Sequence, residues 1–89
     1  MVTIKEVILM QLQADGDQTY KQLIKAVKTQ QTEVSEASSL YEKRLLSGIG
    51  SALYSLCNDH GYVFFDHYEQ AYALTDIGAL AQPELLEIN

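Results

Sequence analysis

Three segments of the sequence carry the same signal for the start of a helix, and this signal constrains the fold more than any other feature. Each has Ser or Thr at its first position and Glu or Gln three residues later, so both side chains can satisfy backbone N–H groups that a helix end leaves unpaired. The three segments are Thr3-Ile4-Lys5-Glu6, Thr19-Tyr20-Lys21-Gln22 and Ser39-Leu40-Tyr41-Glu42. Apolar residues at helical spacing follow each of them. The sequence therefore predicts three helices, over residues 3–14, 19–30 and 40–59.

Glycines mark where these helices end or weaken. Gly16 and Gly61 follow the first and third helices, where the left-handed conformation of glycine terminates a helix. Gly48 and Gly50 fall inside the third helix and each weakens it by about 1 kcal/mol relative to Ala. We therefore expect a kink or an interrupted start near Ser47.

The remaining pattern is extended and then helical again. Tyr62-Val63-Phe64-Phe65 and Ala71-Tyr72-Ala73-Leu74 are rich in β-branched and aromatic residues and are separated by a short polar turn, which predicts a β-hairpin over 62–74. Thr75 then caps a short helix over 75–82. The predicted fold class is therefore α+β. The polar stretch 29–38 predicts a loop or a frayed helix end.

Length and composition narrow the kind of protein. Eighty-nine residues, 47% of them hydrophobic, provide one core and one domain, residues 1–89. Cys57 is the single cysteine, so the chain has neither an internal disulfide nor a thiol cluster for a metal, and we expect a small buried residue there. No membrane-length apolar run and no secretory signal is present, which predicts a cytoplasmic protein without a membrane partner. We expect no metal and no cofactor.

The charge of the chain is divided unevenly along its length. The formal net charge is −6, and all six basic residues lie within the first 44 positions, where six acidic residues balance them. From Leu45 onward there are six acidic residues and no basic one. Such a balance is unusual for a nucleic-acid-binding domain, because Lys and Arg normally supply most of the affinity for phosphate.

The order of helix, helix, helix, hairpin and short helix is that of a winged helix-turn-helix domain, and two segments resemble that family. The segment 52–63, Ala-Leu-Tyr-Ser-Leu-Cys-Asn-Asp-His-Gly-Tyr-Val, looks like the end of a recognition helix, a capping glycine and the first wing strand. The segment 72–80 is similar to the Tyr-x-Leu-Thr-x-x-Gly pattern that closes the wing in small bacterial and archaeal transcriptional regulators. The resemblance implies a DNA-binding domain in transcription regulation, with the helix over 40–59 as its recognition helix.

On this interpretation the outward side of the third helix reads DNA. Its small residues allow close approach, while Asn can pair with adenine and Arg with guanine. The side chains expected on this side are Lys43, Arg44, Ser47, Gly48, Ser51, Ser55 and Asn58, and those expected to hold phosphates from the second helix are Lys21, Lys25 and Lys28. We expect Tyr54, Tyr62 and Tyr72 in the core and Tyr68 outside it.

A second interpretation remains open, because the turn of the hairpin differs from the family pattern. Regulators of this family usually carry Arg or Lys in the wing, whereas here the wing reads Asp66, His67, Tyr68, Glu69 and Gln70. The lysines would then be an ordinary solvated face, and the chain would be an acidic module that binds a basic protein without binding DNA.

Two further expectations concern oligomerisation and catalysis. The apolar and acidic tail over 83–88 either covers its own core or, with the first helix, packs on a second copy to form a homodimer. The sequence lacks a nucleophile with its base, a pair of catalytic acids and a phosphate-binding glycine loop, so we expect no enzyme and no small-molecule substrate.

Overall fold

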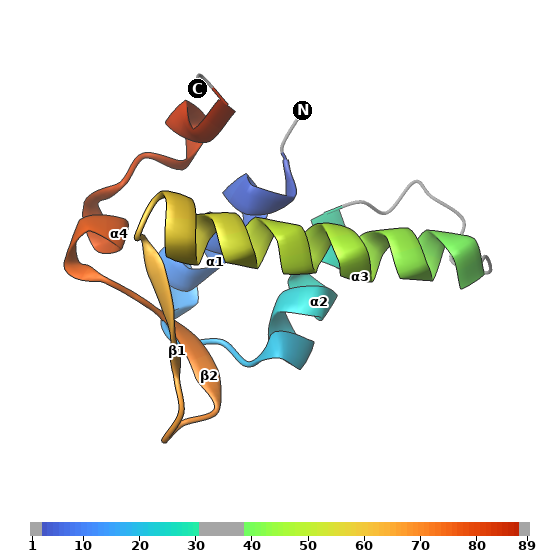
Figure 1. Ribbon diagram of the computed structural model, residues 1–89, viewed down its shortest axis with the longest axis horizontal. Helices are drawn as coiled ribbons and strands as arrows, with labels where there is room; N and C mark the ends of the chain where they lie inside the picture. The colour runs from blue at the N-terminus through green and yellow to red at the C-terminus, as the bar shows by residue number, and fades with distance from the viewer. Residues whose placement is uncertain (1–2, 31–38, 88–89) are drawn as a thin grey trace.

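The computed structural model describes residues 3–30 and 39–87 (Figure 1). It has the α+β composition expected from the sequence, with a two-stranded antiparallel sheet. In Figure 1, α3 lies across the molecule, and the hairpin extends away from its C-terminal end. The elements in chain order are α1 (Ile4–Asp15), α2 (Tyr20–Gln30), α3 (Ser39–Tyr54), the π-helical turn η1 (Ser55–Asp59), β1 (Val63–Asp66), β2 (Ala71–Leu74), α4 (Asp76–Leu80) and the 3-10 turn η2 (Pro83–Glu87).

The first two helices begin with the reciprocal caps that their sequences predict. The Glu6 backbone N–H donates to the Thr3 hydroxyl at 3.2 Å, and the Thr3 N–H donates to the Glu6 carboxylate at 3.1 Å. Thr19 and Gln22 exchange the same two bonds at 3.2 and 2.8 Å. These two capping boxes are confirmed. The side chains of the third, residues 39–42, lie outside the described part of the chain, as do residues 31–38 of the expected loop.

The third helix differs from expectation in where its geometry changes. It is α-helical without a break from Ser39 to Tyr54, so the expected kink near Ser47 is wrong. The change comes later, over Ser55–Asp59, where a wider π-helical turn closes with the His60 N–H donating to the Ser55 carbonyl at 3.0 Å. Gly48 and Gly50 do not interrupt the helix, because the packing of buried side chains around them outweighs the low helix propensity of glycine.

The hairpin is attached to the helices through its second strand. β1 and β2 pair in antiparallel register with Phe65 opposite Tyr72. Tyr72 also pairs with Gln18, in the connection between α1 and α2, by backbone bonds of 3.0 and 2.7 Å. Residues 63–74 therefore form a hairpin whose second strand is held against the α1–α2 connection, with the turn beyond Ala71 projecting from it.

The base of the hairpin is closed by a compact cluster of hydrogen bonds around Thr75. Its hydroxyl donates to the Gly61 carbonyl at 2.6 Å and accepts from the Gly78 N–H at 3.1 Å, which caps α4. Its backbone N–H donates to the Tyr62 carbonyl at 3.0 Å. Gly61, at φ 70°, supplies the left-handed turn between η1 and β1. Through these bonds Thr75 and Gly78, the Thr-x-x-Gly pair of the sequence, connect the two ends of the hairpin.

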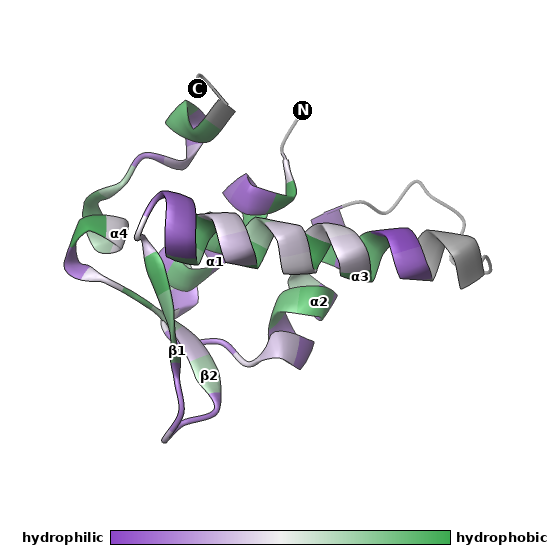
Figure 2. Ribbon diagram, viewed as in Figure 1, coloured by the Kyte–Doolittle hydropathy of each residue, from purple (hydrophilic) through white to green (hydrophobic). Residues whose placement is uncertain are grey.

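One apolar core lies between α1, α2, α3 and the base of the hairpin, and Figure 2 shows the apolar stripes of the helices turned toward it. Leu86 of the tail is buried against the same core, so the tail covers part of its own domain. Burying large aliphatic side chains in this core removes apolar surface from water, and this stabilises the fold. The largest fully buried side chains are those of Ile8, Leu9, Leu12, Leu23, Val27, Ile49, Leu56 and Val63.

Candidate nucleic-acid interface

One side of α3 and of the turn that follows it is left uncovered by the rest of the described chain. Most of the expected reading residues lie on it, and the exposed positions repeat at helical spacing from the second turn of α3 to η1. Residues 43–58 contain no Asp or Glu, although the whole chain has twelve. The exposed residues are Lys43, Arg44, Ser47, Gly50, Ser51, Tyr54 and Asn58, which we call the α3 face.

Two of the residues expected on this side lie elsewhere. Ser55 is half-buried, and its hydroxyl accepts a hydrogen bond from the Lys5 ammonium of α1 at 3.3 Å. Gly48 is turned toward α1, because a Cβ placed on it would lie 2.8 Å from the Ile4 Cδ1 atom. The placement of Ser55 and Gly48 on the outward side is therefore wrong. Both lie on the flank of α3 that contacts α1.

Tyr54 was expected in the core and is instead 67% exposed on the α3 face. Its position could have been found from the sequence, because it lies three residues after Ser51 and seven after Ser47, on the same stripe. The other two tyrosines are half-buried. Tyr62 stacks on His60, with ring centroids 5.1 Å apart, and Tyr72 packs edge-on against Phe65 at 5.0 Å.

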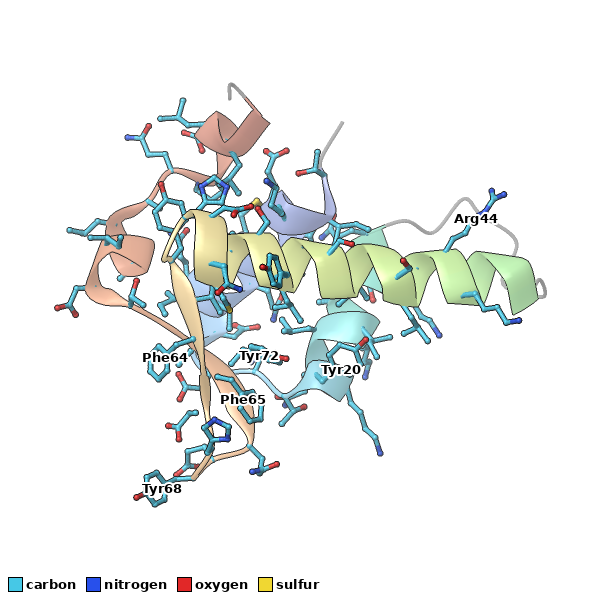
Figure 3. The ribbon with its side chains drawn as sticks, in the orientation of Figure 1. Tyr20, Arg44, Phe64, Phe65, Tyr68 and Tyr72 are labelled. Carbon is cyan, nitrogen blue, oxygen red and sulfur yellow. The ribbon has the colours of Figure 1, made fainter. Side chains whose placement is uncertain are left out.

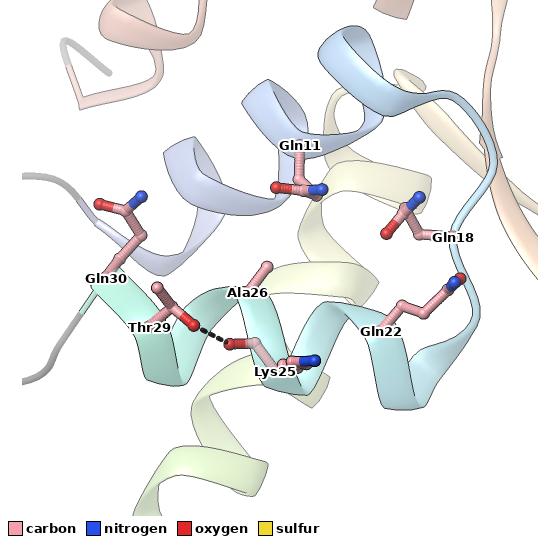
Figure 4. Close-up of a pocket in the computed structure, with 7 residues that line it drawn as sticks. All are labelled: Gln11, Gln18, Gln22, Lys25, Ala26, Thr29 and Gln30. Carbon is pink, nitrogen blue, oxygen red and sulfur yellow. Dashed lines mark hydrogen bonds between the residues drawn. The ribbon is translucent and has the colours of Figure 1, made fainter.

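The three lysines of α2 are all exposed and lie along one side of that helix. Lys25 lines a hollow of about 350 Å³ between α1 and α2, together with polar amide side chains such as Gln11 and Gln18 (Figure 4). The Thr29 hydroxyl donates to the Lys25 carbonyl at 2.9 Å in this wall. Lys25 therefore borders the hollow next to α1, while Tyr20, the N-terminal residue of α2, lies beside Gly50, Tyr54 and Asn58 of the α3 face.

The turn of the hairpin is exposed and carries no basic residue. Tyr68 is 99% exposed at its tip. The Asp66 carboxylate accepts from the backbone N–H groups of Tyr68 and Glu69 at 2.9 and 3.2 Å, so this acid holds the turn in shape. His67 and Glu69 are exposed beside it. Figure 3 shows Arg44 and Tyr68 at opposite ends of the molecule.

Two titratable groups beside the α3 face, Cys57 and Tyr72, have raised pKa values, which favours their neutral forms. Burial raises the pKa of the Cys57 thiol above its ordinary value. Burial, followed by the nearby Cys57 and Tyr20 groups, raises the pKa of Tyr72. A thiol with a raised pKa is a weak nucleophile at neutral pH.

The described part of the chain has neither a cluster of metal-ligating side chains nor a membrane-spanning helix. Residues 3–30 and 39–87 contain no group of three or more His, Cys, Asp or Glu side chains that could hold a metal ion. Within these same ranges, no helix combines the length and apolar character needed to cross a membrane.

Comparison with known proteins gave no relative from which a function could be transferred. A scan against protein-family models found no match, and searches of curated proteins and of solved structures found none either.

Proposed function

We propose that this chain is a winged-helix domain that binds duplex DNA in a regulator of transcription, with α3 in the major groove. The observation that carries the proposal is the α3 face, which is uncovered, has two cationic side chains at its N-terminal end and lacks acidic residues through position 58 in a chain of net charge −6. Small side chains at Ser47, Gly50 and Ser51 let the helix approach base edges closely. The N-terminal part of a recognition helix commonly does most of the reading.

The two cations at the start of α3 would make the strongest contacts. Arg44 has the geometry for a bidentate bond with guanine or a phosphate, and Lys43 can pair with a phosphate. The exposed lysines of α2 would hold the DNA backbone beside α3. A homodimer would double this small number of phosphate contacts, which compensates for a weakly basic surface.

Salt dependence of binding tests the proposal. We would measure the affinity for labelled duplex DNA by fluorescence anisotropy over a series of salt concentrations. Each neutralised phosphate contributes about 0.9 to the slope of log affinity against log salt, so replacing both cations in Lys43→Gln/Arg44→Gln should lower the slope by about 1.8. The matched control is Ala79→Glu/Gln82→Glu, which changes the net charge equally at exposed positions beyond the hairpin. Absence of duplex binding by the wild type at low salt would refute the proposal.

A specific observation favours a second function, the docking of a basic protein. α4 exposes two large aliphatic side chains, Ile77 at 58% and Leu80 at 85%, within the half of the chain that has no basic residue. Apolar side chains exposed in a part of the chain that has acidic but no basic residues suit a partner with apolar and cationic side chains. Ile77→Ser/Leu80→Ser should remove such a partner from nuclease-treated pull-downs and leave DNA affinity unchanged. A partner retained by this variant would argue against the docking role.

A further inference from the structure

An uncharged aromatic hollow lies beside the α3 face, between α2, α3 and the hairpin. Its volume is about 350 Å³. Figure 3 shows Phe65 and Tyr72 of the hairpin reaching toward α2, whose Tyr20 lies across from them. The eight described residues that line the hollow are Tyr20, Gly50, Leu53, Tyr54, Cys57, Asn58, Phe65 and Tyr72.

The lining selects an uncharged, flat ligand over a phosphate group. None of its eight residues carries a charge at neutral pH, because burial raises the pKa of Cys57 and keeps the thiol protonated. Aromatic rings come from four elements, α2, α3, β1 and β2, and aromatic side chains bind nucleobases by stacking without requiring a particular sequence. At Gly50 the wall is open, since a Cβ there would have no atom within 4 Å. A ring can therefore approach the α3 backbone closely.

The rim provides polar groups suited to the edge of a base. The Asn58 amide nitrogen donates to the Tyr54 carbonyl at 3.0 Å, which orients the amide and directs its oxygen to act as an acceptor. The hydroxyls of Tyr20 and Tyr72 add groups that can donate or accept. This combination of stacking faces with a few oriented polar groups is typical of sites that hold bases outside the helical stack.

The position of the hollow connects it to the proposed DNA interface. Gly50, Tyr54 and Asn58 belong both to its lining and to the α3 face, so DNA docked on α3 covers the hollow. Base pairs that remain stacked keep their flat faces inside the duplex and cannot fill it. We propose that the hollow receives an unpaired base, so that the domain prefers DNA with a bulged nucleotide to a perfect duplex. This inference rests on the proposed DNA binding by α3.

The test compares three labelled DNAs of the same sequence: a perfect duplex, a duplex with one bulged nucleotide, and a duplex whose bulged position lacks the base. The abasic bulge has the same backbone flexibility and charge, so it isolates the contribution of the base. We expect the base-containing bulge to bind at least about fivefold more tightly than the abasic one, the lower limit for loss of one stacked base. It should also protect Cys57 from alkylation, whereas the abasic bulge should not.

Matched variants assign the effect to the hollow. Tyr54→Ala should remove the preference for the base, and Tyr54→Phe should retain it, because the ring and not the hydroxyl supplies the stacking. Tyr68→Ala is the control, since Tyr68 is also a highly exposed tyrosine but lies outside the hollow.

The outcomes separate this inference from the proposed function. If none of the three DNAs binds, both fail together. If all three bind with equal affinity, DNA binding stands and the hollow is refuted as a base site. If the preference survives in Tyr54→Ala, or is lost equally in Tyr68→Ala, the base lies elsewhere and the inference is also overturned.

Discussion

Gly78→Ala tests the contact that holds α4 against the base of the hairpin. A Cβ on Gly78 would lie 1.9 Å from the Tyr62 carbonyl oxygen and 2.7 Å from its carbon. Both are backbone atoms, so no side chain can rotate away to make room. The same carbonyl accepts the Thr75 N–H at 3.0 Å, and displacing it weakens that bond as well.

The expected loss in the free energy of unfolding follows from these contacts. Overpacking of this kind costs about 1–3 kcal/mol. Weakening the hydrogen bond adds about 1 kcal/mol. Alanine regains about 1 kcal/mol over glycine within a helix. The net loss is about 2 kcal/mol, which lowers the Tm of a domain of this size by about 8–16 °C.

Two other glycines provide internal controls for this measurement, made by urea and thermal unfolding with circular dichroism. Gly50→Ala meets no atom within 4 Å and should stabilise the protein by about 0.5–1 kcal/mol. A Cβ on Gly48 would lie 2.8 Å from the flexible end of the Ile4 side chain, so the stability of Gly48→Ala should lie between those of Gly78→Ala and Gly50→Ala. The packing argument is refuted if Gly78→Ala is as stable as the wild type, or if Gly50→Ala is destabilised to the same extent.

Three further predictions concern capping and titration. Thr75→Val removes the hydroxyl bonds to Gly61 and Gly78 with little change in shape, and should cost about 1–2 kcal/mol in urea unfolding; no change would exclude a capping role. Thr3→Ala should cost about 1 kcal/mol by loss of the α1 cap, while an unchanged midpoint would show that this cap is dispensable. Because the pKa of Cys57 is raised, the folded protein keeps this proton to higher pH than the unfolded chain, so stability falls as pH rises above the ordinary thiol pKa. Cys57→Ser should reduce this alkaline loss, as measured by unfolding at several pH values.

Local signals in the sequence are sufficient to predict the helices and the hairpin, but not the contacts between them. The caps at Thr3 and Thr19 are exchanges between residues three positions apart, so the sequence alone contains both partners. The pairing of Gln18 with Tyr72 joins positions far apart in the chain through a single bridge, and no periodic pattern marks it. Only the folded chain brings the hairpin beside the α1–α2 connection.

In the candidate site, too, local spacing predicts some positions correctly, while contacts between distant residues determine the others. The regular spacing of small residues along α3 correctly placed Ser47 and Ser51 on its exposed side. Ser55 shares that spacing, but Lys5 of α1 binds its hydroxyl, and the π-helical turn beginning there changes the helical phase. The usual burial of aromatic residues in small domains predicts Tyr54 in the core, but its position on the exposed side of the helix overrides this preference.

The position of the charges matters more for DNA binding than their sum. Exposed charges are screened beyond about 8–10 Å at physiological salt, while the longest extent of the molecule is 38 Å. Acids on the hairpin turn are therefore too remote to oppose phosphates held near Arg44, at the other end of the molecule (Figure 3). A wing that touched the backbone would bring Asp66 and Glu69 against phosphates, so binding through α3 requires an orientation that keeps the turn away from the DNA. The uncharged aromatic hollow lies between the cations of α3 and the acidic turn. In that orientation the hairpin can contact nucleic acid through the residues that line this hollow, because they carry no charge that would repel phosphates.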